Sequence, residues 1–159
     1  MIKILPIITL PNPILRKKSI ELNLKKIATD EIKKLCSNMY ATVIKADGVG
    51  LSAPQIGKNI RLIVLNTKDG QLNLLNPELI KKSWGKNWDS EGCLSLPGIY
   101  GKVKRHKKVT CQYFNEIGEK LTLNTKGLFA RVIQHEIDHL DGILFIDKAI
   151  EIENQQKNE

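Results

Sequence analysis

The stretch Gln134-His135-Glu136-Ile137-Asp138-His139-Leu140 is the part of this sequence from which the fold and the chemistry can be worked out. Residues four apart on a helix lie one above the other, so His135 and His139 can bind the same divalent ion. A bound cation lowers the pKa of a coordinated water from about 15.7 to about 7, and Glu136 is close enough to take the proton. The pattern therefore predicts metal-dependent hydrolysis of a carbonyl compound. An amphipathic helix with two hydrogen-bonded histidines is the alternative.

A third protein ligand for the ion is expected from upstream of this helix. Catalytic zinc sites usually have three protein ligands and one open position. One large group of zinc peptidases supplies a third histidine six residues after the second. Here Gly142 is in place, but Phe145 stands where that histidine would be, and no histidine follows His139.

The three cysteines differ in their surroundings. Cys93 lies in Glu91-Gly92-Cys93-Leu94-Ser95, followed by a Pro-Gly pair that is typical of a turn. Cys36 falls in a helical pattern and Cys111 in an alternating, strand-like one, so both are interpreted as small buried hydrophobes. Cys93 is therefore the expected thiolate ligand.

A glycine-rich segment, 48–57, follows the end of the expected first helix. Gly48 and Gly50 allow another backbone to approach closely. Gln55 offers an uncharged hydrogen-bond donor that can face an oxyanion, or it is an ordinary loop amide.

Together these segments resemble the peptide deformylases. That family has a Gly-x-Gly-Leu-Ala-Ala-x-Gln loop, a Glu-Gly-Cys-Leu-Ser turn and a Gln-His-Glu-x-Asp-His-Leu helix, in this order. The chain departs from the motifs only at Ser52, where alanine is usual, and this concerns local packing of the loop. The likeness extends from about residue 11 to about residue 148. It implies removal of the formyl group from the N-terminal formylmethionine of newly made bacterial or organellar polypeptides.

The resemblance also implies a role for each matching residue. The metal ligands would be Cys93, His135 and His139. Glu136 would act as general base on the metal-bound water and then as general acid toward the leaving amine. The backbone N–H of Leu94 and the side-chain amide of Gln55 would face the oxyanion.

Substrate contacts are expected from two sets of residues. Val49, Gly50 and Gly92 match family positions whose backbone pairs with an extended peptide, which gives affinity without sequence preference. Leu128 and Val132 share the inward stripe of the metal-binding helix, and they either line a pocket for the methionine side chain or pack in the core.

The expected cofactor is one divalent ion. The resemblance points to Fe2+ as the native ion, with Zn2+, Ni2+ or Co2+ able to use the same ligands. A thiolate-bound ferrous ion needs a reducing compartment, and three cysteines give no disulfide framework. No signal peptide or membrane-spanning run is visible, so a bacterial cytoplasmic location is expected, although an organellar chain that has lost a transit peptide fits as well.

The net charge of +8 raises the question of a nucleic-acid partner. The lysines are spread along the chain, with one dense cluster at 102–108, and no specific DNA binding is expected. This cluster either favours association with ribosomal RNA or forms a solvated surface. Arg105 lies inside it, near a family position close to the substrate, and is not assigned to the site.

The expected fold is α+β, with mostly antiparallel sheets around a central helix that carries the metal ligands. Residues 1–150 form one catalytic domain, and 151–159 a polar tail, frayed or weakly helical. The expected elements are an extended N-terminal strand at 1–10, helices at 30–45 and 125–140, strands at 61–66 and 72–75, and a hairpin of 109–114 with 120–123. Thr125 is the expected N-cap of the second helix, and Gly142 its stop.

Two other functions are compatible with parts of the sequence. The helix motif alone would suit a general metallopeptidase. The positive charge would suit a non-catalytic ribosome- or RNA-binding domain on the same fold. Retention of the five key residues, Gln55, Cys93, His135, Glu136 and His139, favours the deformylase.

Overall fold

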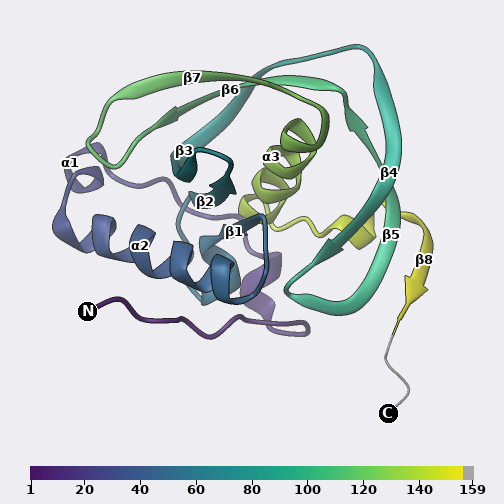
Figure 1. Cartoon of the computed structure of the whole chain (residues 1–159), viewed down its shortest axis with the longest axis horizontal. Helices are drawn as coiled ribbons and strands as arrows, with labels where there is room; N and C mark the ends of the chain where they lie inside the picture. Colours follow the sequence, from purple (N-terminus) through teal and green to yellow (C-terminus); the bar gives the residue numbers. More distant parts are fainter. Residues whose placement is uncertain (156–159) are drawn as a thin grey trace.

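Two antiparallel sheets lie on either side of helix α3 (Gly127–Leu140) in the computed structural model, which describes residues 1–155 (Figure 1). The larger sheet has the order β1 (Gly50–Ser52), β2 (Leu62–Thr67), β3 (Gly70–Lys82), β6 (Lys108–Phe114) and β7 (Lys120–Lys126). The smaller has the order β4 (Lys86–Cys93), β5 (Leu96–His106) and β8 (Ile150–Asn154). The chain is therefore α+β with antiparallel sheets, as the sequence predicts.

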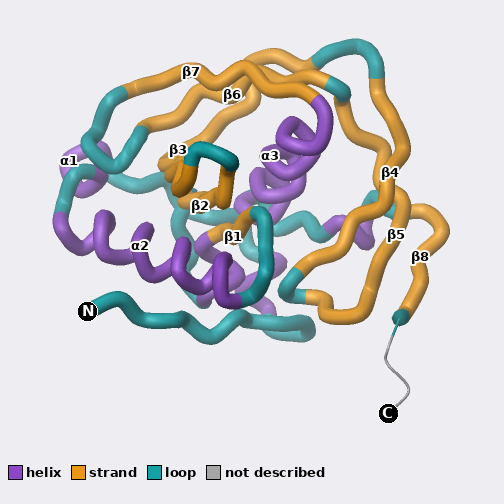
Figure 2. The backbone as a smooth tube through the Cα atoms, in the orientation of Figure 1, coloured by secondary structure: helices purple, strands orange, loops and turns teal. Residues whose placement is uncertain are grey.

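Short helical segments connect these elements (Figure 2). They are η1 (Pro13–Arg16), α1 (Leu24–Ile27), η2 (Ala53–Ile56) and η3 (Phe145–Asp147).

Helix α2 (Asp30–Lys45) has the bounds expected from the sequence. Ile32, Cys36, Met39 and Val43 recur at helical spacing and are buried together with residues of β1 and β2. Cys36 and Cys111 are both buried, which confirms their interpretation as core residues. The helix ends just before the glycine-rich segment, so that segment begins at the edge of the larger sheet, where it forms β1.

Helix α3 begins two residues later than expected. Thr125 is not its N-cap, because it remains in β7 opposite Val109, and Lys126 is the cap residue instead. The expected stop is confirmed: Gly142 has φ 73°, and its N–H donates to His139 O while that of Ile143 donates to Asp138 O. These two bonds form a Schellman motif. A Cβ on Gly142 would lie 2.5 Å from Arg16 O, so only glycine fits there.

The strands agree with expectation in part. The hairpin of β6 and β7 is confirmed. Strand β3 continues well past the expected residue 75, because bulges on either side of Glu78 let it pass Asn76 and Pro77 and still pair with β6. The long hairpin of β4 and β5, which ends in the cysteine turn, was not expected, since most of β4 is exposed and polar.

Both ends of the chain differ from expectation. The N-terminal arm is not a strand: the N–H of Lys3 donates to Asn38 Oδ1 at 2.8 Å and that of Leu5 to Thr42 Oγ1 at 2.9 Å, both side chains of α2. Ile150–Asn154 form strand β8 rather than a frayed or helical tail, because they pair with the edge of β5. The last residues of the expected tail, 156–159, lie outside the described residues. Within 1–155, no helix has the length and apolar character needed to cross a membrane.

Candidate metal and catalytic site

Three potential metal ligands converge between α3 and the end of β4. The ligand atoms of Cys93, His135 and His139 all lie within 4.8 Å of one another, and Cys93 Sγ is 3.2 Å from His139 Nε2. Metal–ligand bonds of 2.0–2.3 Å in a tetrahedral site place the ligand atoms about 3.5 Å apart. The donor set and its spacing therefore fit one divalent cation.

The two imidazoles differ in their hydrogen bonding and in their pKa. His135 Nδ1 lies 2.9 Å from Glu91 Oε2, which leaves Nε2 for a cation. Burial lowers the pKa of His135, but its contacts with Cys93 and Glu91 raise that pKa to about 10, so metal binding must release a proton there. Burial and the charge of His135 lower the pKa of His139 well below its usual value, so this ring is neutral and ready to bind.

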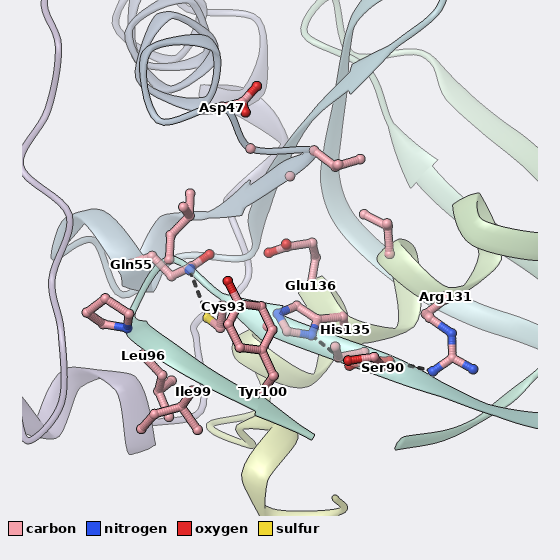
Figure 3. Close-up of a pocket in the computed structure, with 18 of the residues that line it drawn as sticks. Asp47, Gln55, Ser90, Cys93, Leu96, Ile99, Tyr100, Arg131, His135 and Glu136 are labelled. Atoms are coloured by element: carbon pink, nitrogen blue, oxygen red, sulfur yellow. Dashed lines mark hydrogen bonds and ion pairs between the residues drawn. The ribbon is translucent and has the colours of Figure 1, made fainter. Parts of the chain in front are cut away.

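Glu136 points into the same space with an unused carboxylate oxygen (Figure 3). Its side chain is buried, and among the described residues Glu136 Oε2 has no hydrogen-bond partner. A Cβ built on Gly50 would lie 2.9 Å from Glu136 Oε1, so glycine is needed for the helix and β1 to approach this closely. Burial raises the pKa of Glu136 to about 7, a value suited to proton transfer near neutral pH.

The side chain of Gln55 also approaches Cys93, and hydrogen bonds hold it in one orientation. Its Oε1 accepts from the N–H and the hydroxyl of Ser52, at 2.9 and 3.0 Å. Its Nε2 is thereby directed toward Cys93 Sγ at 3.5 Å and Ser95 Oγ at 3.2 Å (Figure 3). The hydroxyl of Ser52, which an alanine would lack, is therefore a second donor that orients the amide.

A cavity of about 590 Å³ joins these groups. All the site residues expected from the sequence line it except His139, which is 1% exposed: Val49, Gly50, Gln55, Gly92, Cys93, Leu94, Leu128, Val132, His135 and Glu136. Leu128 is 68% exposed, which excludes the alternative of core packing for that residue. Val132 both lines the cavity and packs against the core of the larger sheet.

Comparison with known proteins identifies the family. The profile of the polypeptide deformylase family matches residues 4–155. The peptide deformylase of Syntrophomonas wolfei is 50% identical over 145 residues, which cover 91% of this chain and 93% of that protein. This chain belongs to the peptide deformylase family. It is an enzyme that removes the N-terminal formyl group from newly made polypeptides.

Solved peptide deformylases share the fold closely. The Met-Ala-Ser-bound enzyme of Acinetobacter baumannii gives a TM-score of 0.89 at 30% identity, covering 93% of this chain and 99% of that one. The actinonin complex of the Synechococcus elongatus enzyme gives 0.87 at 37% identity, covering 92% and 79%.

This deformylase also has a buried charge hub next to the candidate metal ligands, formed by Glu91, Arg105 and Arg131, which the sequence did not reveal. Glu91 accepts hydrogen bonds from Arg105 Nε at 2.9 Å and from Arg131 NH1 at 2.8 Å, besides its contact with His135. Burial raises the pKa of Glu91, but the bonds from Arg105 and His135 outweigh it and hold that pKa well below its usual range. The carboxylate therefore stays ionised.

Arg105 does not line the catalytic cavity, and it is not an exposed charge of a basic strand. It is 3% exposed and bridges Glu91 to Asp138 on α3. Arg131 lies one turn before His135 on the same helix face, so its spacing was the available signal of a buried role. Both arginines connect the smaller sheet to helix α3.

Proposed function

We propose that Cys93, His135 and His139 hold one divalent cation, and that this cation is Fe2+ in the cell. The mixed imidazole and thiolate donor set supports an ion of this class, and Zn2+, Ni2+ or Co2+ suits the same ligands. A cation held there supplies positive charge that polarises the formyl carbonyl and lowers the pKa of water. In this proposal helix α3, which lies between the two sheets, carries two of the three metal ligands.

Glu136 is the proton carrier of the reaction. Its buried, unpartnered Oε2 and its pKa of about 7 let it accept a proton from the attacking water. The same oxygen then delivers this proton to the amine that departs when the formyl group is hydrolysed.

Gln55 and Leu94 stabilise the oxyanion that forms on the formyl group. The amide of Gln55 is oriented before substrate arrives, because Ser52 holds its oxygen. The N–H of Leu94 lies in the turn between β4 and β5, next to Cys93. Loss of one such donor costs about 10²–10³ in turnover.

The substrate is an N-formylmethionyl peptide bound in extended form. Strands β1 and β4 are the edges of their sheets and line the cavity through Gly50 and Gly92, while Val49, just before β1, lines it as well. An extended peptide pairs with such edges through its backbone, which admits many sequences. Leu128 and Val132 form the wall for the methionine side chain. The Met-Ala-Ser peptide of the Acinetobacter enzyme supports this class of ligand.

The catalytic unit is a single domain that extends past residue 150, because strand β8 (Ile150–Asn154) belongs to its smaller sheet. Because its cysteines are free and its metal site contains a thiolate, we place its action in the reducing cytoplasm, near ribosomes. The net charge of +8 supports this association through attraction to ribosomal RNA.

Replacement of Glu136 by glutamine tests the catalytic assignment. Turnover of formyl-Met-Ala-Ser is expected to fall about 10²–10⁴-fold, because the amide cannot carry the proton. Metal content, measured on the same sample, is expected to be unchanged. Loss of the metal from Glu136→Gln would make Glu136 a ligand and overturn the assignment. Cleavage of an unformylated peptide by the parent enzyme would instead favour a general metallopeptidase.

Thiol labelling tests the ligand set independently of activity. Burial raises the pKa of Cys36 to about 12 and that of Cys111 to about 11, so at pH 8 only about one Cys111 thiol in a thousand is ionised. We expect one fast-reacting thiol in the metal-free protein, none after zinc is added, and none in the metal-free Cys93→Ser variant. A fast thiol that zinc does not protect would exclude Cys93 as a ligand.

A further inference from the structure

The turn between β3 and β4, in the upper right of Figure 1, contains a tryptophan, Trp84, whose side chain is fully exposed. Trp84 lies in the turn of residues 83–85, which is fixed by hydrogen bonds to the neighbouring strand connection. Ser83 N–H donates to Lys108 O, and Lys107 N–H donates to Gly85 O, both at 2.9 Å. The backbone of this turn is therefore held in place while the indole projects into solvent.

Lysines gather on the strands next to this turn. Ser83, the residue before Trp84, lines a cavity of about 510 Å³, together with four lysines, Val109 and polar residues of β6 and β7. The four are Lys81, Lys82, Lys108 and Lys126. The lining contains no aspartate or glutamate, and within residues 1–155 none of the four forms a salt bridge.

The strand register makes this accumulation of charge costly for the folded chain. Lys108 on β6 lies directly opposite Lys126 on β7. Like charges at directly opposed positions destabilise an antiparallel pair. Repulsion without a compensating acid is relieved when a polyanion occupies the cavity.

We propose that this basic corner, defined as Trp84 with Lys81, Lys82, Lys108 and Lys126, binds single-stranded RNA. The lysines of the cavity contact successive phosphates, and Trp84 stacks on an unpaired base at its rim. Base–aromatic stacking combined with a positively charged groove is the usual means of holding single strands without sequence preference. RNA is the relevant polyanion because the substrates of this enzyme are newly made polypeptides.

The shape of the surface favours a nucleic acid strand over an anionic lipid surface. Four lysines line an open depression along which a phosphate backbone can lie. A bilayer-binding surface needs a broad apolar face to bury. Here Trp84 is the only aromatic residue of the turn, and lysines flank it on both sides in the sequence.

The corner is separate from the catalytic cavity. Strand β4 connects the two, with Lys86 at one end and Cys93 at the other, about 23 Å apart at the usual rise per residue of a strand. No residue of the basic corner lines the catalytic cavity. RNA bound at the corner therefore leaves hydrolysis of a free formyl peptide unaffected, and this separates the proposal from the catalytic assignments.

The proposal is tested with the metal-loaded enzyme and a fluorescein-labelled uridine 12-mer, using fluorescence anisotropy at several salt concentrations. Four phosphate contacts on a single strand predict a slope of about −3 for log K against log salt. Trp84→Ala is expected to weaken binding about tenfold, and Trp84→Phe to retain it within about threefold. In a Trp88→Phe background, RNA should quench the remaining tryptophan fluorescence.

A matched pair of variants separates a site from general positive charge. Lys108→Gln/Lys126→Gln should reduce the magnitude of the salt slope by about 1.4. Lys33→Gln/Lys34→Gln changes two exposed lysines on α2, with the same loss of charge, and should leave affinity within twofold. Equal losses in both double variants, or unchanged binding by Trp84→Ala, would overturn the proposal. So would binding to phosphatidylserine vesicles with none to the 12-mer, or equal affinity for duplex RNA. Turnover of formyl-Met-Ala-Ser should be unchanged in all variants.

Discussion

The two ends of strand β4 carry charge in opposite ways. At the catalytic end, Glu91 is buried and ionised, and it is matched by two arginines and His135. At the other end, the basic corner gathers lysines that are exposed and have no acid among the residues of their cavity. Strand β4 thus connects a site whose charges are paired within the protein with a site whose positive charges have no acidic partner in their cavity.

This difference indicates what each region does. Buried ions that satisfy one another hold their partners in fixed geometry, because losing one leaves the others unpaired in a poorly solvated interior. Glu91 can therefore fix the ring of His135. Exposed lysines that repel one another gain nothing within the folded chain, so their grouping is better explained by a ligand than by stability.

Removal of Glu91 tests the balanced end and has the largest expected effect. Glu91→Ala leaves Arg105 and Arg131 without their shared acid, at a cost of about 3–5 kcal/mol in the free energy of unfolding. Zinc affinity should fall about 10–100-fold, because His135 loses the acceptor that orients it. Urea denaturation and competition with a chelator measure the two effects. If Glu91→Gln keeps full zinc affinity, an amide oxygen is sufficient to orient His135, and the charge of the hub serves stability alone.

Removal of Arg131 also tests the catalytic end of β4, and its expected effect is smaller. Arg131 also donates to Val103 O and Asn87 O, at 2.8 and 2.9 Å. Arg131→Met should therefore cost about 2–3 kcal/mol in the free energy of unfolding, from buried acceptors left unpaired. Arg105 still pairs with Glu91, so zinc affinity is expected to stay within about threefold of the parent value. A tenfold loss would show that the hub acts on His135 as a single unit.

The cluster of candidate metal ligands and the main helices were predictable because short-range rules determine them. Two histidines four apart share a helix face whatever surrounds them, and α2 repeats its apolar residues at helical spacing. Cys93 could be selected from three cysteines because the other two sit in regular apolar patterns. These properties are local to the sequence, so they do not depend on contacts between distant parts of the chain.

The parts that the sequence did not predict depend on partners far along the chain. Strand β8 is polar and forms because β5 offers an edge, and β4 is a strand because it pairs with β5 along most of its length. Arg105 looked like one charge of a basic cluster, and its burial follows from Glu91 and Asp138. The pairing of Arg105 with Glu91 and Asp138 in particular has no signature in a single sequence, since nothing near Arg105 in the sequence distinguishes it from an exposed arginine.

The smallest effect is expected at the unbalanced end, from the opposed lysines. Lys108→Gln should raise the free energy of unfolding by about 0.2–1 kcal/mol in low salt, because it removes a like-charge pair across β6 and β7. The gain should shrink in about 1 M salt, where the screening length is about 3 Å. Lys126→Gln should give the same gain, and the double variant little more, since one substitution already ends the repulsion. Additive gains would show that each lysine is repelled by the wider corner and not by its cross-strand neighbour, and a loss of stability in either single variant would remove the energetic argument for an external polyanion.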